Sequence, residues 1–274
     1  MIKILVTSLC LLSAVIFAKS AKAENIPIEV AKTAARDKLH LFFPGEWSYF
    51  DYFVLYNLAD EPAAYAVIFS NQNTAKAKLA DLEKPMDNIR EHIKSHSSSI
   101  EKIISSHGKS GKAKNMEISK VQKEIDKLNN RLRHKDSYVT VITGAQDTLP
   151  VVLKCYRGLP NLFVKKKEAH NLINNKYPER EWHFQRYLYL GTFDESIQFI
   201  HTEKEYKNTE ESSELVPFIV DLRSRSINRK DITLKEKGQL LENRKINNRK
   251  TSWEGQNIKQ WERYRKKIDN KVPR

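Results

Sequence analysis

The chain contains two thiols and several imidazoles from which a nucleophilic site could be built. Its two cysteines are Cys10 and Cys155, and its eight histidines could serve as bases. A Cys–His dyad needs a thiolate in an exposed position, held beside an imidazole. Cys155 instead falls within an alternating apolar stretch, where a thiol is usually buried and unreactive. We therefore expect no catalytic dyad of Cys155 with either His170 or His183.

Other catalytic and ligand-binding patterns are absent from the sequence. It has no glycine-rich phosphate loop, no paired cysteines, no His-Glu-x-x-His and no Gly-x-Ser-x-Gly. No histidine has a partner at metal-ligand spacing. His96 lies on an apolar helical stripe without a second ligand, so we interpret it as a polar register residue rather than a metal ligand. We expect no catalytic, cofactor-binding or metal-binding residues.

The first residues have the pattern of a secretory signal. Lys3 supplies a positive end, residues 4–18 are apolar, and residues 21–23 (Ala-Lys-Ala) form a small-x-small cleavage site before Glu24. The apolar run is shorter than the ~20 residues of a membrane span; an uncleaved membrane anchor is the alternative. We expect an exported protein, periplasmic or extracellular. Because Cys10 leaves with the signal, the domain must be stable without an internal disulfide.

Hydrophobic periodicity divides the rest of the chain into an α+β body. Strands are expected wherever apolar residues alternate, and helices wherever they recur every three or four residues. The expected helices lie at residues 27–41 and 161–175, and the expected strands form hairpins at 52–69, 138–156 and 182–200, followed by polar loop at 204–214 and a short strand at 215–222. This order predicts a mainly antiparallel sheet with helices packed on it.

An inserted helical segment interrupts this body. Apolar residues step by three and four from Leu79 to Ile103, and again from Ile118 to Leu132, on either side of a glycine-containing turn. Two such stripes predict an antiparallel helical hairpin of the coiled-coil type. The predicted signal is residues 1–23, and the α+β domain comprises residues 24–75 and 136–222. The inserted hairpin is residues 76–135, and the basic tail is residues 223–274.

The charge is concentrated in the tail. The chain has a formal net charge of +14, and residues 223–274 hold 17 Lys and Arg against 6 Asp and Glu. A helical face that contains Ile258, Trp261 and Ile268 makes this tail a basic amphipathic helix, which is typical of segments that bind anionic surfaces. Folding back onto the body through Trp253 and Trp261 is an equal alternative.

Two more features predict contact with a partner. Apolar and polar positions alternate through residues 182–190, with Trp182 and Phe184 on one face of the strand. Tyr187 and Tyr189 lie on the opposite face. There they are either anchors for a partner or covered by the second helix. Lys165, Lys166 and Lys167 stand at the start of a helix, against the helix dipole. They indicate either a contact surface or a solvated run of charge.

Residues 54–69 and the preceding helix at 28–35 resemble the start of the streptopain-type cysteine-peptidase propeptide. The resemblance resumes at residues 138–156, at Arg157-Gly-Leu-Pro160, in the helix that contains Ala169, and at Tyr187-Leu-Tyr-Leu-Gly191. It covers residues 26–70 and 137–201. It implies an exported domain of the kind that holds a papain-fold protease inactive, or a free-standing inhibitor of the same fold.

Two functions remain open, and neither is enzymatic. The first is a propeptide-like or inhibitor-like module that binds a papain-fold peptidase. The second is an envelope protein whose helical hairpin and basic tail bind a partner protein or an anionic polymer. Nucleic acid is a less favoured partner, because the protein is exported and its tail has few aromatic residues. The candidate contact residues are Tyr187, Tyr189, Arg157, Lys165, Lys166, Lys167 and Trp261.

Overall fold

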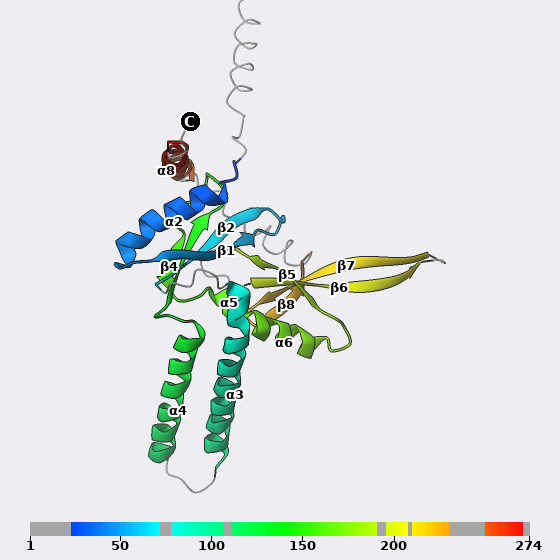
Figure 1. Cartoon of the computed structure of the whole chain (residues 1–274). Helices are drawn as coiled ribbons and strands as arrows, with labels where there is room; N and C mark the ends of the chain where they lie inside the picture. The colour runs from blue at the N-terminus through cyan, green and yellow to red at the C-terminus, as the bar shows by residue number, and fades with distance from the viewer. Residues whose placement is uncertain are drawn as a thin grey trace, which may run out of the picture.

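The computed structural model describes residues 23–71, 78–106, 111–190, 196–207, 210–230 and 250–270. The predicted signal therefore lies outside the described residues, apart from Ala23. The fold is α+β, as the periodicity predicted, with helices packed around one mainly antiparallel sheet (Figure 1). In the described part of the chain, no helix is both long and apolar enough to cross a membrane.

The sheet has eight strands in the order β4-β3-β2-β1-β5-β6-β7-β8. All neighbours are antiparallel except β1 and β5, which are parallel. The strands are β1 (Ser48–Tyr56), β2 (Pro62–Ser70), β3 (Tyr138–Gly144), β4 (Lys154–Arg157), β5 (His183–Leu188), β6 (Ser196–Lys207), β7 (Glu210–Asp221) and β8 (Ser226–Arg229). The β1–β5 junction joins two antiparallel halves of four strands each.

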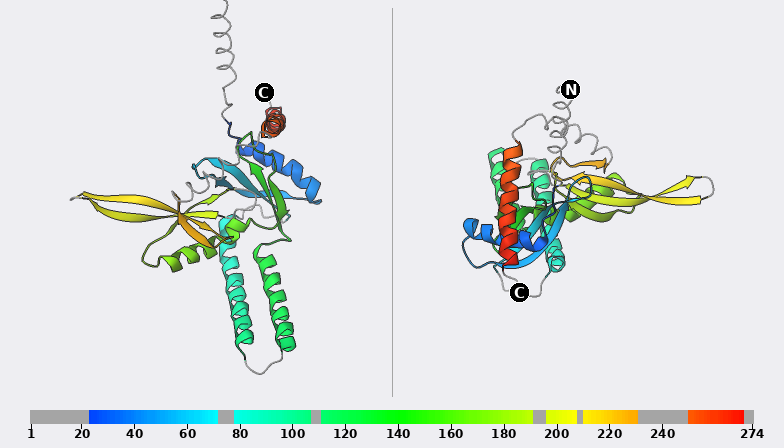
Figure 2. Two further views of the ribbon diagram at one scale, coloured as in Figure 1. Left: turned by 180° about the vertical axis from the view of Figure 1, so that it is seen from behind. Right: turned by 90° about the horizontal axis from the view of Figure 1, so that it is seen from above.

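The first half of the sheet is covered by α2 (Ile28–Phe42) and α8 (Lys250–Asp269). Alanines 31, 34 and 35 on the buried face of α2 are fully covered, and their small side chains let the helix lie close to β2 and β3. Above α2 lies α8, and Figure 2 shows the two helices adjacent in the view from above. The apolar stripe of each helix is thus buried in one common core.

The second half of the sheet is covered by α5 (Asn161–Val164) and α6 (Lys166–Lys176). Ala169 and Ile173 on α6 are fully buried against this half. Beyond α6, the strands β6 and β7 continue as a long two-stranded ribbon that projects from the body (Figure 1).

The inserted hairpin consists of α3 (Glu83–Ser105) and α4 (Gly111–Leu132), preceded by the short helix η1 (Leu79–Leu82). The two helices lie side by side and extend away from the sheet (Figures 1 and 2). They connect β2 to β3, which pair from Ala64 opposite Gly144 to Ser70 opposite Tyr138. The helical arm is therefore an enlarged connection between two neighbouring antiparallel strands.

The base of the arm belongs to the core. Met86 is fully buried and Leu132 nearly so, in a cluster with Phe163 and Val164 of the body. Farther out, the stripe residues Ile100 and Ile103 are only half-buried. The helices α3 and α4 thus form a projecting arm whose base is packed into the domain.

Two predictions about the later part of the chain are wrong. Residues 204–207 and 210–214, which were expected to be loop, lie in β6 and β7. The sheet also continues past residue 222, because β8 pairs with β7. A strand pair needs only backbone hydrogen bonds, so a ribbon that leaves the body needs no apolar alternation.

The basic tail folds back onto the body through Trp261. Its side chain is 0% exposed, and its indole N–H donates to the Leu149 carbonyl at 2.9 Å. Asn257 donates to the Thr148 carbonyl at 2.9 Å, and Lys267 pairs with Asp37 on α2. Trp261 is therefore not available as a contact residue on a free tail, because it docks α8 on the body; the side chain of Trp253, the other residue of that alternative, lies outside the described residues.

Candidate functional site

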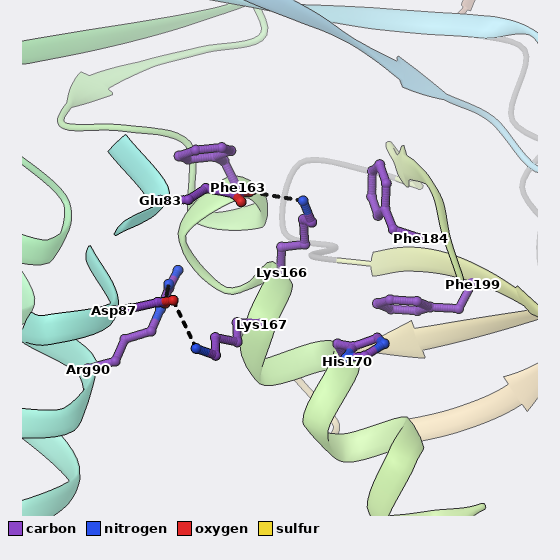
Figure 3. A pocket seen from close by; sticks show the side chains of 9 residues that line it. All are labelled: Glu83, Asp87, Arg90, Phe163, Lys166, Lys167, His170, Phe184 and Phe199. Carbon is purple, nitrogen blue, oxygen red and sulfur yellow. Dashed lines mark hydrogen bonds and ion pairs between the residues drawn. The ribbon is translucent and has the colours of Figure 1, made fainter. Parts of the chain in front are cut away.

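A pocket of about 280 Å³ lies where the arm, α6 and the second half of the sheet meet (Figure 3). Its walls carry charged side chains and its floor is aromatic. The lining residues are Glu83, Asp87 and Arg90 of α3, Phe163 of α5, Lys166, Lys167 and His170 of α6, and Phe184 and Phe199 of β5 and β6.

Ion pairs cross the pocket from α6 to α3. Lys166 Nζ lies 2.9 Å from Glu83 Oε1, and Lys167 Nζ lies 3.0 Å from Asp87 Oδ2. Arg90 holds the other oxygen of Asp87 at 2.5 Å and also donates to the Val164 carbonyl at 2.7 Å. Lys166 and Lys167 therefore bind the arm to the body, and they are not merely a run of solvated charge.

The paired cations also affect the Asp87 carboxyl. A hydrogen bond from Lys167 is the largest cause that lowers the pKa of Asp87, desolvation opposes it, and Arg90 contributes further lowering. The lining contains three cations and two carboxylates, so the pocket has a small positive excess when His170 is neutral.

Phe184 forms the exposed part of the aromatic floor. It is 38% exposed, although its ring lies against Tyr187 at 4.8 Å and Phe199 at 6.3 Å between centroids. The ammonium of Lys166 lies 5.1 Å from the centre of the Phe184 ring, a cation–π distance. Phe163 and Phe199 are buried behind it. The floor can therefore accept an apolar side chain without rearrangement of the core.

His170 borders the pocket, but both of its ring nitrogens are occupied. Nε2 lies 3.1 Å from the Trp182 carbonyl oxygen, which can only accept, so Nε2 carries the proton. Nδ1 lies 3.2 Å from Asn174 Nδ2 and accepts from that amide. These bonds fix the ring and its tautomer, and they indicate a structural role for His170.

The strand beside the pocket is paired on one side only among the described residues. β1 and β5 pair at only two positions, Leu55 with Tyr187 and Tyr56 with Leu188. Among the described strands, β5 residues 183–186 pair with β6 alone. The exposed Phe184 lies within this segment. The site thus combines a pocket that has an aromatic floor and charged walls with a stretch of strand that has one β neighbour among the described strands.

Tyr187 lies inside the fold. It is 8% exposed, and its ring packs against Phe53 at 4.6 Å. Burial raises the pKa of Tyr187, and the charge of Glu83 adds to the shift. Tyr189 is half-buried against the same core, and its amide donates to the Tyr56 carbonyl at 2.9 Å. The two tyrosines therefore stabilise the body, and the prediction that Tyr187 is an accessible anchor is wrong.

The remaining predicted contact residues are dispersed. Arg157 is exposed on the edge strand β4, with its guanidinium 5.4 Å from the Phe43 ring centre. Lys165 lies between α5 and α6, and its amide donates to the Asn161 carbonyl at 2.8 Å. The hairpin predicted at residues 182–200 forms β5 and β6 in the middle of the sheet, whose outer strands are β4 and β8.

Cys155 is half-buried in β4, packed against the core under α2. Burial raises the pKa of the Cys155 thiol to about 11, so the thiol form prevails at neutral pH. In the described residues, no three His, Cys, Asp or Glu side chains are grouped as a metal site would need.

Sequence reasoning missed the acidic side of the pocket. Glu83, Asp87 and Arg90 are spaced by four and three residues, which places them on one helical face. This face matches the lysines of α6 in charge, and that complementarity was the available signal. The pairing itself depends on how the arm docks, which neither segment shows alone.

No protein-family model, no curated protein and no solved structure matches this chain.

Proposed function

We propose that this protein is a non-enzymatic binding module for an extended segment of a partner protein. The observation that carries the proposal is that β5 residues 183–186 pair with β6 alone among the described strands, beside the exposed ring of Phe184. An added strand gains main-chain hydrogen bonds along a strand that is paired on one side, and a pocket for one side chain supplies specificity. The resemblance to cysteine-peptidase propeptides makes a papain-fold peptidase the favoured partner.

The charge pairing of the pocket suits a protein side chain. The pocket measures about 280 Å³ and is open to solvent. The carboxylates in its walls are already paired with lysine or arginine. An apolar side chain would therefore cover Phe184 without leaving an unpaired charge, and the surplus cation would favour an acidic neighbour.

Phe184→Ala tests the proposal, with Phe42→Ala as the matched control. Phe42 is 58% exposed at the end of α2, far from the pocket in the fold. The probe is a set of purified, exported papain-fold peptidases in which the catalytic cysteine is replaced by alanine. We expect at least one to bind, and Phe184→Ala to weaken that binding by about 30-fold, the scale of a hot-spot residue, with Phe42→Ala unchanged. If no peptidase binds, or both variants bind equally, the proposal fails.

A second candidate function rests on a groove between the arm and α6. This groove has a volume of about 870 Å³, and its lining has six basic residues against two acidic ones. The basic residues are Arg90, Lys94, Arg133, Lys165, Lys167 and Arg225. Such a groove favours an anionic polymer, whose binding would weaken as salt screens the charges.

The second candidate calls for a point substitution rather than removal of the tail, because β8 and α8 are parts of the fold. Lys94 is exposed on α3, and Lys94→Glu reverses its charge in the groove. We expect this variant to elute from an anionic polysaccharide matrix at lower salt, while Lys259→Glu on α8 serves as the control. Equal elution of the two variants would indicate attraction by net charge alone.

A further inference from the structure

Backbone hydrogen bonds hold the first described residues of the chain. Ile26 N–H donates to the Ala145 carbonyl at 2.9 Å, and Asn25 forms a β-bridge with Gln146. Asp147 N–H donates to the Glu24 carbonyl at 3.0 Å. The chain is therefore bound to the β3–β4 connection up to Glu24, the residue that follows the predicted cleavage site.

The backbone nitrogen of Glu24 lies beside a buried acid. Glu24 N donates to Asp147 Oδ1 at 3.0 Å, and Asp147 is only 8% exposed. Within the described residues, the Glu24 amide is the hydrogen-bond donor recorded for this carboxylate. A buried carboxylate that receives only a neutral donor is poorly compensated, since burial of charge is unfavourable without a partner charge.

The charges around this point do not balance while Glu24 N is an amide. Among the described residues, the charged groups that hydrogen bonds and ion pairs place there are Asp147, the Glu24 side chain and Arg265 of α8, whose Nη1 lies 3.0 Å from Glu24 Oε2. Arg265 and the Glu24 side chain neutralise each other. One negative charge, that of Asp147, remains, and a positive charge on Glu24 N would neutralise it.

We propose that Asp147 is a binding site for the α-ammonium group that cleavage between Ala23 and Glu24 creates. A leader-cleaving peptidase adds water across this bond. The Ala23 carbonyl carbon becomes a carboxylate, and the Glu24 nitrogen leaves as an amine that takes up a proton. The new ammonium then forms an ion pair with Asp147 where the amide formed a neutral hydrogen bond. Processing thereby stabilises the folded protein relative to its precursor.

Arg265 extends this site to the C-terminal helix. It pairs with the Glu24 side chain, and Trp261 one turn earlier is buried on the Leu149 carbonyl, two residues from Asp147. The processed terminus, the β3–β4 connection and α8 therefore meet at one place. Cleavage after Ala23 would therefore strengthen the site at which Glu24 and α8, near the two ends of the described chain, are held together.

The test compares the chain that begins with a free Glu24 amine with the same chain acetylated on that nitrogen. Acetylation restores a neutral amide and changes no side chain. We expect the free form to melt about 3–8 °C higher at pH 7, the range for a charge-assisted hydrogen bond in a chain of this size. Asp147→Asn should abolish the difference between the two forms.

The pH dependence gives an independent result if Asp147→Asn fails to fold. An α-amino group titrates at about pH 8 in an unfolded chain, and a carboxylate neighbour raises its pKa in the folded state. The advantage of the free form should be complete below about pH 8 and disappear as the pH rises through the raised value. Equal melting temperatures at pH 7, or a difference that is constant up to pH ~11 or survives Asp147→Asn, would overturn the proposal.

Discussion

The rings of Phe184 and Tyr187 lie 4.8 Å apart, although strict alternation along a strand would place the two side chains on opposite faces. The cause is a register shift in the β5–β6 pair between Phe184 and Arg186, where an extra residue, Gln185, enters β5. A bulge of this kind exchanges the faces of the residues that follow it. It brings Tyr187 into the core and leaves Phe184 at the pocket.

Tyr187 should therefore affect stability rather than partner binding. Tyr187→Ala removes a buried ring that contacts Phe53 and Phe184, and we expect it to lower the free energy of unfolding by about 3 kcal/mol or more. Urea unfolding followed by circular dichroism measures the loss. Phe184→Ala, at a partly exposed site, should lower it by clearly less. An equal loss for the two variants would contradict this assignment.

Trp261 should anchor α8 to the body. Trp261→Ala leaves a cavity under the helix, and the expected loss of stability is about 3–5 kcal/mol. Trp261→Phe keeps most of the packing but removes the donor to the Leu149 carbonyl, so a loss of about 1 kcal/mol is expected. Chemical unfolding measures both, with the exposed Lys259→Ala as control. Unchanged stability in Trp261→Ala would mean that α8 is not docked in solution.

The outer part of the arm should be dispensable for folding. Replacement of residues 95–123 by a short Gly/Ser turn keeps the buried base, including Met86 and Leu132. Because closure entropy varies only with the logarithm of loop length, we expect cooperative unfolding with a similar midpoint. Met86→Ala in the full-length arm should instead lower stability by about 2–5 kcal/mol. Thermal melts compare the two; a truncated protein that does not unfold cooperatively would show that the whole arm is part of the core.

His134 should make stability depend on pH near neutrality. Burial lowers the pKa of His134 below its ordinary value of 6.5, and its Nε2 is buried without a hydrogen-bond partner among the described residues. A group whose pKa is lower in the folded state than in the unfolded state stabilises the protein at pH values above its unfolded-state pKa. This stabilisation is lost as the pH falls through the folded-state pKa. We therefore expect the melting temperature to fall from pH 7 to pH 5.

His134→Asn should reduce that fall. Asparagine does not titrate, and it tolerates the positive φ of 49° at this position. The exposed His92, on the same side of the arm, provides the control through His92→Asn. Melting curves at several pH values make the comparison, and an identical slope in His134→Asn and the native protein would exclude His134 as the cause.

The sequence predicted those parts of the fold in which one face of a helix or strand is buried. Burial of one face produces a regular spacing of apolar residues, which can be read from the sequence. Met86 and Ile93 of the arm, and Ala31 and Ala34 of α2, recur every three to four residues because one helical face is covered. The order of hairpins and helices then followed, and with it the α+β class. Neither the polar strands beyond His201 nor the bulge at Gln185 leaves such a period, so both were missed.

The candidate site was harder to predict because it depends on contacts between distant segments. Lys166 and Lys167 were identified as unusual, but Glu83 and Asp87 lie about eighty positions away. Their pairing is set by the angle at which the arm leaves the sheet. Trp261 presented the same difficulty, since an amphipathic pattern shows that a face is covered and not what covers it.

The placement of the arm between β2 and β3 has a consequence for the order of folding. Ser70 and Tyr138 pair directly but are separated by 68 positions in the chain, and contacts of such separation form slowly. The helices of the arm need only local contacts, and helical segments form in about a microsecond. Once α3 and α4 associate, their bases bring the ends of the two strands together. We expect formation of the arm to bring β2 and β3 together, so that this strand pair forms at the rate of a short hairpin.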